Sequence, residues 1–457
     1  MGLVRSWLAR HPERNAISWR GGTVTYRQLQ ELADAYVDEL DRLGASAGTV
    51  LAARVDCTPD SVAFLLAAIE TRTILVPLDR RSGASSLTAG LELAQAEMLY
   101  EVGRLGGTRA ADVIVQLTST GHRAAHPLYD ELRQREAPGL VLFTSGSSGE
   151  PKGAVHDVDH LLRRFRSPGK DLRTLLFFFL DHISGLDTLF YALSNGSEIV
   201  APDNRSVDNV CRNIERYAVE VLPTSPSFLN LLVLGRGAER FDLSSLVYIT
   251  YGGEVMPERT LERLTADFPD VRLSQKYGST EVGALRISPE SSSSVWFRFG
   301  DAGTKTRIVD GVLQIRSSSA MLGYLNAESP FTEDGWYDTR DAVEQRGDLV
   351  RILGRVNDAI SVGGERVHPA KIENVILQLD EVADVSVFGE PNIVLGNVVC
   401  ARVVPSREMD RFELRRKVQR HCRARLAPRE VPVRVIPERE LPLAPNFKKG
   451  RRQSLVG

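Results

Sequence analysis

The sequence predicts an α/β protein in which a large N-terminal part, built on a mostly parallel sheet, precedes a small α+β part. Three observations support this prediction. Strand-like apolar runs alternate with amphipathic segments from residue 26 onward, a short apolar run at residues 140–143 leads into a glycine-rich turn, and the pattern changes near residue 355. With 457 residues and 42% hydrophobic content, the chain can bury more than one core.

The N-terminal segments follow a strand–helix–strand order. Residues 26–40 carry apolar side chains at three- and four-residue spacing, and Gly44 follows as a helix-ending residue. We then expect a strand at residues 50–55, a buried helix at 60–72 and a second strand at 73–79. This βαβ order predicts parallel pairing.

The densest apolar run, residues 175–180, is far shorter than the roughly 18 residues of a membrane span. We therefore interpret it as a buried strand. Residues 291–294, four consecutive serines, are expected to form an exposed loop tip.

The C-terminal part has shorter elements. A boundary is expected at residues 355–358, and a helix follows at 369–379. Strands at 383–389 and 398–405 and a helix at 410–426 complete a small α+β unit.

Composition excludes several classes of protein. A net charge of -2 argues against a nucleic-acid binder with a strongly basic surface. The four cysteines lack a CxxC pair, which indicates reduced, buried thiols in a cytoplasmic protein rather than a disulfide framework or a zinc site. The early charges at the N-terminus are not those expected of a signal peptide.

Residues 143–153, FTSGSSGEPKG, are suited to anion binding. The spacing is not that of the phosphate loop of nucleotide hydrolases, because Gly153 follows Lys152 where that loop has serine or threonine. Glycines and hydroxyl groups can nevertheless surround a phosphate, and the preceding apolar run resembles a strand that presents such a turn. A flexible Gly/Ser linker is the alternative interpretation.

Six segments occur in the order found in adenylate-forming enzymes, the family of acyl-CoA synthetases, nonribosomal peptide synthetase adenylation domains and luciferases. They are residues 144–156 (TSGSSGEPKGAVH), 251–257 (YGGEVMP), 277–283 (YGSTEVG), 335–341 (GWYDTRD), 354–373 (GRVNDAISVGGERVHPAKIE) and 441–452 (LPLAPNFKKGRR). The resemblance covers nearly the whole chain. It implies a core domain of stacked α/β sheets at residues 1–356 and a small mobile lid at 357–457, with a hinge near Asn357.

The resemblance also implies the reaction, in which ATP activates a carboxylic acid as an acyl adenylate and pyrophosphate leaves. It assigns nucleotide contacts to Thr144, Ser145, Ser147, Ser148 and Lys152 at the β- and γ-phosphates, to Gly252, Gly253, Glu254 and Tyr277 at the adenine, and to Asp341 and Arg355 at the ribose. The implied catalytic residues are Thr280 at the α-phosphate, Glu281 as the Mg²⁺ ligand and Lys448, which bridges the carboxylate and the α-phosphate. Lys449 lies beside Lys448 and could replace it if the alignment shifts by one.

The same resemblance places His182, Ile183 and Gly278 at the acid pocket. Ile183 stands where relatives that activate amino acids carry an aspartate, so we expect an acid without an α-amine, unless Asp181 takes that position. Gly363 and Gly364 resemble the wall of a pantetheine tunnel, which favours CoA as the acceptor. A carrier-protein pantetheine, an amine or another nucleophile, nitrite activation, and a regulatory adenylate-binding protein remain as alternatives.

Three positions depart from the family pattern. Arg340 and Phe447 replace glycines, and Asn357 stands where the hinge is usually aspartate or lysine. These departures suggest a divergent branch of the family.

Overall fold

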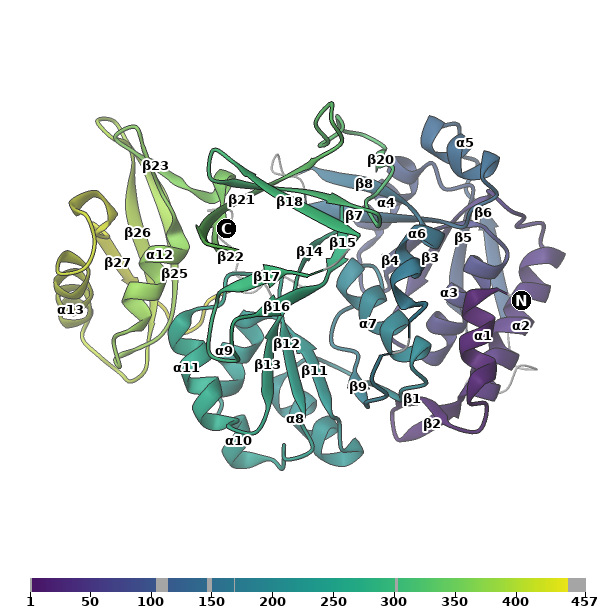
Figure 1. The fold of residues 1–457 in the computed structure, drawn as a ribbon, viewed down its shortest axis with the longest axis horizontal. Helices are drawn as coiled ribbons and strands as arrows, with labels where there is room; N and C mark the ends of the chain where they lie inside the picture. The colour runs from purple at the N-terminus through teal and green to yellow at the C-terminus, as the bar shows by residue number, and fades with distance from the viewer. Residues whose placement is uncertain (1, 104–113, 146–149, 168, 301–302, 443–457) are drawn as a thin grey trace.

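The structure is a computed structural model that describes residues 2–103, 114–145, 150–167, 169–300 and 303–442. Two seven-stranded sheets form the body of the molecule (Figure 1). The first has the order β13 (Arg272–Gln275), β12 (Tyr248–Tyr251), β11 (Val221–Thr224), β9 (Thr174–Leu175), β10 (Ile199–Ala201), β1 (Asn15–Trp19), β2 (Gly22–Thr25). The second has the order β20 (Gly323–Tyr324), β8 (Pro151–Asp157), β7 (Gly139–Ser145), β4 (Ile74–Asp79), β3 (Val50–Val55), β5 (Met98–Gly103), β6 (Ile114–Ser119).

Both sheets are mainly parallel, and the first is antiparallel only where the edge strand β2 pairs with β1. In the second sheet β7, β4, β3 and β5 pair in parallel, whereas β8 and β6 pair antiparallel with their neighbours. The helices of this region are α1 (Leu3–Arg10), α2 (Tyr26–Arg42), α3 (Pro59–Glu70), α4 (Ala84–Ala94), α5 (Pro127–Gln134), α6 (Val158–Leu162), α7 (Ile183–Ser194), α8 (Val207–Tyr217), α9 (Pro226–Leu234), α10 (Gly237–Arg240) and α11 (Glu258–Asp267). The predicted α/β class, with a mostly parallel arrangement, is confirmed.

The first predicted elements form at the positions that their sequence patterns predict. Thr25 caps α2 through a reciprocal capping box with Gln28, and Gly44 follows the helix with φ +77°. One buried cluster includes Leu51 of β3, Ile199 of β10 and side chains of α2, α3 and α7. A single core therefore packs strands of both sheets together.

The prediction of a strand at residues 175–180 is wrong, because β9 ends at Leu175. The chain beyond β9 is buried but irregular, and two of its carbonyl groups accept hydrogen bonds from a side chain instead of a neighbouring strand. Arg205 Nη2 donates to the Leu176 carbonyl at 3.1 Å, and Arg205 Nε donates to the Phe177 carbonyl at 2.9 Å. A buried guanidinium thus replaces the sheet ladder here.

An antiparallel six-stranded sheet and a separate hairpin connect the body to the C-terminal unit. The sheet has the order β16 (Ile287–Pro289), β17 (Phe297–Phe299), β22 (Leu349–Arg355), β21 (Tyr337–Arg346), β19 (Val312–Ser317), β18 (Thr304–Val309). The hairpin consists of β14 (Tyr277–Ser279) and β15 (Gly283–Leu285). The serine run at 291–294 lies in the connection between β16 and β17, as predicted.

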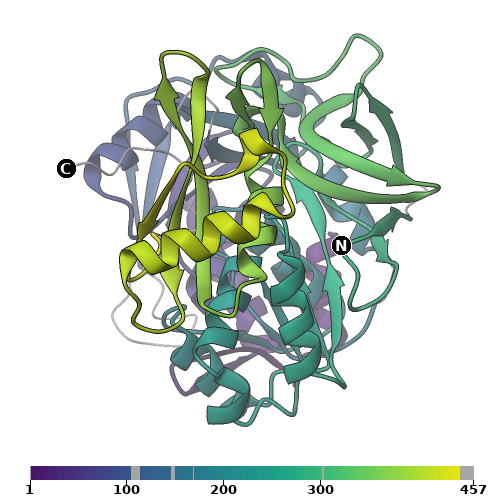
Figure 2. The same cartoon turned by 90° about the vertical axis from the view of Figure 1, so that its left-hand side faces the viewer.

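After the short 3-10 helix η3 (Val356–Asp358), the chain forms its own sheet and core. The order is β24 (Glu365–Val367), β23 (Ile360–Val362), β26 (Gly396–Pro405), β25 (Val382–Asn392), with β27 (Arg434–Pro437) beside β26. Helices α12 (Pro369–Leu377) and α13 (Arg411–Arg423) contribute to a separate buried cluster drawn from residues 360–435. Figure 2 shows α13 lying across the outward side of this unit.

The C-terminal unit touches the body through α9 and α11. Asn230 Nδ2 of α9 donates to the Ala383 carbonyl at 3.5 Å, and Arg259 of α11 pairs with Asp380. All four cysteines are buried free thiols, as expected. Among the residues that the structure describes, no helix is both long and apolar enough to cross a membrane.

Candidate active site

The glycine-rich loop joins two paired strands. Thr144 at the end of β7 lies opposite Lys152 at the start of β8, and Ser145 lies opposite Pro151. The Lys152 ammonium lies 5.1 Å from the ring centroid of Tyr324, on β20. Ser147 and Ser148 fall outside the described residues. The predicted strand before the glycine-rich segment is present as β7, and the phosphate-binding roles stay predictions.

A carboxylate, a phenol and a guanidinium meet where β14 approaches the antiparallel sheet. Asp341 of β21 lies opposite Arg355 of β22, whose Nε is 3.6 Å from Asp341 Oδ1. The Tyr277 hydroxyl donates to Asp341 Oδ2 at 2.5 Å. The structure therefore brings together three residues that the sequence places far apart.

Burial is the largest influence on the charge state of Asp341. It raises the pKa of Asp341, although the Tyr277 hydrogen bond and the Arg355 charge act in the opposite direction. Arg355 keeps more than half of its side chain exposed, at 56%, so its guanidinium is accessible to a ligand. Asp341 is a two-oxygen acceptor in a protected position, which suits the binding of a pair of hydroxyl groups.

Glu281 lies in the turn of the same hairpin and is only 8% exposed. Its Oε1 accepts a hydrogen bond of 2.6 Å from the Tyr324 hydroxyl. Burial would raise the pKa of Glu281, but the Tyr324 bond and other donors lower it overall, so the side chain is ionised at neutral pH. The predicted residue Thr280 immediately precedes it in the turn between β14 and β15.

Close backbone approaches explain two of the predicted glycines. A Cβ at Gly252 would lie 2.6 Å from the Lys276 carbonyl oxygen, and one at Gly278 would lie 2.4 Å from the Gly283 carbonyl oxygen. Gly253 has φ +81°, and Glu254 Oε2 accepts from the backbone of Ser227 near the start of α9. The Glu254 carboxylate therefore supports α9 while its backbone continues the turn.

His182 and Ile183 begin α7, with His182 as the N-cap residue. His182 Nε2 lies 3.9 Å from Asp181 Oδ1, and Asp181 is a mostly buried carboxyl whose pKa is raised by burial. Ile183 lines a recess together with Gly283 and Ala284 of β15. Asp181 is not among the residues that line this recess.

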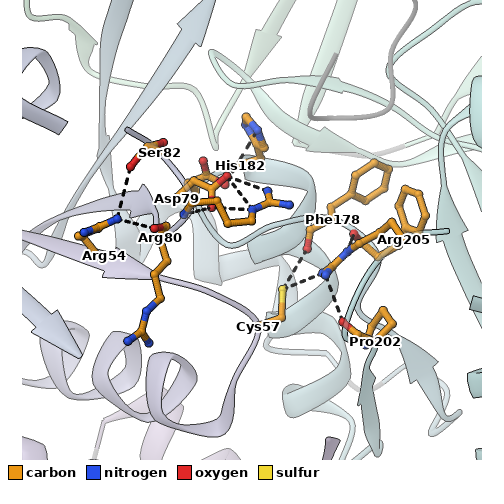
Figure 3. A network of polar contacts seen from close by, with 12 residues as sticks. Arg54, Cys57, Asp79, Arg80, Ser82, Phe178, His182, Pro202 and Arg205 are labelled. Carbon is orange, nitrogen blue, oxygen red and sulfur yellow. Dashed lines mark hydrogen bonds and ion pairs between the residues drawn. The ribbon is translucent and has the colours of Figure 1, made fainter. Parts of the chain in front are cut away.

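A polar network holds the loop before α7 in place (Figure 3). Arg205 donates to the Pro202 carbonyl at 3.2 Å and to Cys57 Sγ at 3.1 Å, and its guanidinium lies 4.2 Å from the ring centroid of Phe179. Arg81, paired with Asp79 at 2.7 Å, lies 3.7 Å from the centroid of the same ring. Two guanidinium groups thus fix the segment that presents His182.

The predicted tunnel glycines lie elsewhere, in the C-terminal unit. Gly363 and Gly364 form the two-residue turn between β23 and β24, with φ +59° and +85°. The Gly363 N-H donates to the Leu395 carbonyl at 2.8 Å, a contact inside the same unit. Among the described residues, a Cβ at Gly363 would meet Leu395 of the same unit and one at Gly364 would meet nothing within 4 Å, so neither glycine lies against Tyr277, Asp341 or Glu281. Lys448 falls outside the described residues.

Sequence reasoning missed Tyr324 and Tyr337 beside Glu281, and Arg164 and Asp187 in the lining of the recess. Tyr324 is 43 positions from its partner Glu281, and Arg164 is 23 positions from Asp187 in the ion pair between them. No spacing pattern along the chain predicts that residues this far apart meet. A tyrosine in an otherwise apolar segment is the signal that was available for Tyr324.

Comparison with known families decides the classification. The family model described as AMP-binding enzyme matches residues 4–325, and the one described as AMP-binding enzyme C-terminal domain matches residues 371–448. This chain belongs to the AMP-binding enzyme family. The predicted relationship to adenylate-forming enzymes is confirmed.

Curated relatives of this AMP-binding enzyme include several ligases. It is 26% identical to the indoleacetate–CoA ligase of Aromatoleum aromaticum, covering 88% of each chain, and 25% identical to the 2-succinylbenzoate–CoA ligase of Bacillus cereus, covering 99% of this chain and 98% of that protein. It is also 25% identical to a plipastatin synthase polypeptide of Bacillus subtilis, covering 98% of this chain but 19% of that protein.

Solved structures share the fold. The anthranilate CoA ligase AuaEII, in complex with anthranoyl-AMP, superposes with a TM-score of 0.82 at 19% identity, covering 98% of this chain and 95% of that one. The amide bond synthetase McbA of Marinactinospora thermotolerans has a TM-score of 0.80 at 22% identity, covering 98% and 97%. The predicted stacked α/β architecture with a smaller C-terminal domain is confirmed.

Proposed function

We propose that this AMP-binding enzyme is an ATP-dependent, AMP-forming ligase that activates a carboxylic acid and transfers it to the thiol of CoA. The acid–thiol ligase class agrees with the CoA ligases among its relatives. The observation that carries the proposal is the convergence of Tyr277, Asp341 and Arg355 on one acceptor site, with Glu281 of the same hairpin nearby in sequence.

The chain's own residues divide the work of the first half-reaction. Asp341 holds the ribose hydroxyls, and Arg355 supplies positive charge at the nucleotide. Lys152 and the turn before it bind the terminal phosphates. A carboxylate oxygen of the acid then forms a bond to the α-phosphorus as the bond to pyrophosphate breaks, and the leaving pyrophosphate carries away the electron pair. Positioning and charge neutralisation provide most of the rate enhancement.

The residues present fit Mg²⁺. Glu281 is buried, ionised and offers oxygen ligands, and no group of three or more histidine, cysteine, aspartate or glutamate side chains suited to a metal occurs in the described ranges. Mg²⁺ in nucleotide sites is held by one or two carboxylates plus the substrate phosphates, so a single buried glutamate is an adequate protein ligand. When bound, the ion would supply additional neutralisation of phosphate charge.

In the second half-reaction the CoA thiolate forms a bond to the acyl carbon, and AMP leaves with the bonding electron pair. We propose that residues 357–457 rotate about Asn357 between the two steps and that the Gly363–Gly364 turn then borders the pantetheine arm. Ile183, at the start of α7, cannot neutralise an ammonium group, which supports an acid without an α-amine.

Pyrophosphate release measured with ATP and Mg²⁺ tests this function. A panel of aryl, short-chain and medium-chain acids, amino acids and nitrite would be assayed with CoA, with a carrier protein and with no acceptor. Release that depends on one carboxylic acid and yields its CoA thioester is the expected result. A product found only on the carrier protein would favour loading of that protein, which the partial match to plipastatin synthase supports. Tight ATP binding without release for any acid would contradict the ligase function.

A further inference from the structure

Residues 321–326, here called the connecting segment, include the short strand β20 and contact two parts of the candidate site. The first part of this segment contacts Glu281. The Met321 N-H donates to the Glu281 carbonyl at 2.8 Å, and the Tyr324 hydroxyl donates to Glu281 Oε1 at 2.6 Å. One segment therefore holds both the backbone and the carboxylate of Glu281.

The second part of the connecting segment contacts the strand that follows the glycine-rich loop. The Leu325 N-H donates to the Gly153 carbonyl at 2.8 Å, and the Gly153 N-H donates to Asn326 Oδ1 at 3.1 Å. Asn326 Nδ2 also donates to the Pro151 carbonyl at 2.9 Å. Hydrogen bonds to this segment thus fix the residues on both sides of Lys152.

Tyr324 contacts both of the charged side chains. Its ring centroid lies 5.1 Å from the Lys152 ammonium, which is within range of a favourable cation–π contact, while its hydroxyl is bonded to Glu281. Tyr324 pairs with Ala154 of β8 and packs with Ala154 and Met321 in a small buried cluster. A side chain that is packed and bonded in this way has little freedom to rotate, so it relates the position of the lysine to that of the carboxylate.

Lys152 and Glu281 carry opposite charges but are kept apart. In the part of the chain that the structure describes, the two side chains form no ion pair with each other, and Tyr324 contacts both instead. A direct ion pair would satisfy each charge with the other and leave less for a ligand. A phosphate chain with its Mg²⁺ requires a cation and a carboxylate at separate, fixed places.

We infer that Tyr324 is a positioning residue for the first half-reaction, and that the connecting segment fixes Lys152 relative to Glu281. The inference rests on the proposed function, from which it takes the phosphate role of Lys152 and the Mg²⁺ role of Glu281. Its effect should appear with ATP and Mg²⁺ but not with AMP, because AMP lacks the two phosphates assigned to Lys152.

Calorimetric titration measures this effect without turnover. ATP and AMP would each be titrated into the protein in the absence of any acid, with Mg²⁺ or with a chelator. Tyr324→Phe removes the hydroxyl and keeps the ring. It should reduce about 10-fold the gain in ATP affinity that Mg²⁺ provides, because it removes a hydrogen bond that orients a charged acceptor. The affinity for ATP in the chelator and the affinity for AMP should not change.

Two further variants separate the contacts of the connecting segment. Tyr324→Leu also removes the ring beside Lys152, so the affinity for ATP should fall in the chelator as well, by about 2- to 5-fold. Asn326→Ala removes two hydrogen bonds to the start of β8. It should weaken ATP binding both with and without Mg²⁺ and leave AMP binding unchanged.

Tyr26→Phe is the matched control. Tyr26 is also buried, and its hydroxyl donates to the Ser197 carbonyl at 2.8 Å, in the first sheet region. This variant should lower the melting temperature, as Tyr324→Phe does, but leave all nucleotide affinities unchanged. A Tyr324→Phe protein with an unchanged Mg²⁺ effect, or with equal losses for ATP and AMP, would overturn the inference.

Rate measurements separate failure of this inference from failure of the proposed function. In Tyr324→Phe, pyrophosphate release should slow while thioester formation from a preformed acyl adenylate keeps its rate, because pyrophosphate is absent from the second step. If no acid releases pyrophosphate but Tyr324→Phe reduces the Mg²⁺ effect on ATP binding, the positioning role stands and the ligase function fails. Pyrophosphate release with unchanged nucleotide affinities in the Tyr324 and Asn326 variants would retain the ligase function and reject the positioning role.

Discussion

The Tyr277 hydroxyl donates a hydrogen bond of 2.5 Å to Asp341 Oδ2 and so connects the β14–β15 hairpin to the antiparallel sheet. This bond fixes the orientation of a carboxylate whose other oxygen faces Arg355. Because both residues belong to segments that resemble nucleotide-binding motifs, the bond organises the proposed ribose site before ATP arrives.

The first prediction concerns ATP affinity at this site. Asp341→Asn should weaken ATP binding about 10- to 100-fold, because hydrogen bonds to a charged acceptor contribute about 1.5–3 kcal/mol. Isothermal titration with ATP in the absence of acid measures this directly. Asp338→Asn, on the same strand, is the matched control and should bind ATP normally. Unchanged affinity in Asp341→Asn would remove the ribose role.

The same pair predicts a pH dependence. Burial raises the pKa of Asp341, so ATP affinity should fall as the pH drops through that raised pKa and the carboxylate becomes protonated. Tyr277→Phe removes a hydrogen bond that lowers the pKa, so the acid limb should move to higher pH. Dissociation constants for ATP measured across the acidic to neutral range in both proteins give the comparison. Coincident acid limbs would show that Tyr277 does not tune Asp341.

A second prediction separates the two half-reactions. Lys448→Ala should reduce adenylate formation about 100-fold or more but spare thioester formation from a preformed acyl adenylate, because this lysine stabilises charge only at the α-phosphate. Lys449→Ala is the built-in control. A large loss in Lys449→Ala with normal adenylation by Lys448→Ala would mean that the alignment is wrong by one residue.

The third prediction follows from the geometry of the Gly363–Gly364 turn. Both residues have positive φ, so Gly363→Ala should destabilise the hairpin by about 1 kcal/mol whatever the enzyme binds. Gly363→Asn tolerates that conformation and still adds a side chain. If the turn borders the pantetheine arm, Gly363→Asn should slow thioester formation more than adenylation. Equal rates in both steps, with a normal melting temperature, would place the arm elsewhere.

The fourth prediction uses the departure at Arg340. This residue adopts φ +59°, a conformation that glycine accepts without strain. Arg340→Gly should therefore raise the free energy of unfolding by up to about 1 kcal/mol, measured by urea titration. Arg340→Ala also removes the 3.4 Å contact with Asp338 but keeps the strain, so it should not be stabilising. A destabilised Arg340→Gly would indicate that the arginine makes a compensating contribution.

The fifth prediction tests the network below His182. Arg205→Leu should lower the free energy of unfolding by about 2 kcal/mol or more, because it leaves the buried carbonyls of Leu176 and Phe177 without a donor. Arg212→Leu, on the exposed side of α8, is a control and should change it by less than about 0.5 kcal/mol. A near-neutral Arg205→Leu would show that other groups satisfy these carbonyls.

Local sequence patterns correctly predicted the elements whose formation depends mainly on their own residues. The spacing before Gly44 predicted α2, and alternating apolar runs predicted β3, α3 and β4 close to their observed bounds. Residues 175–180 were predicted wrongly for a physical reason. A buried apolar run requires partners for its carbonyls, and here a distant arginine provides them in place of a strand.

The sequence by itself determined the α/β class, the order of the motifs and the residue types that a nucleotide requires, since these follow from spacing along the chain. Only the tertiary structure placed Tyr277 against Asp341, Tyr324 against Glu281, and Arg164 against Asp187. These contacts join segments separated by tens of residues, and no local periodicity specifies which of them meet. Folding of the sheets around shared cores decides which of these segments meet.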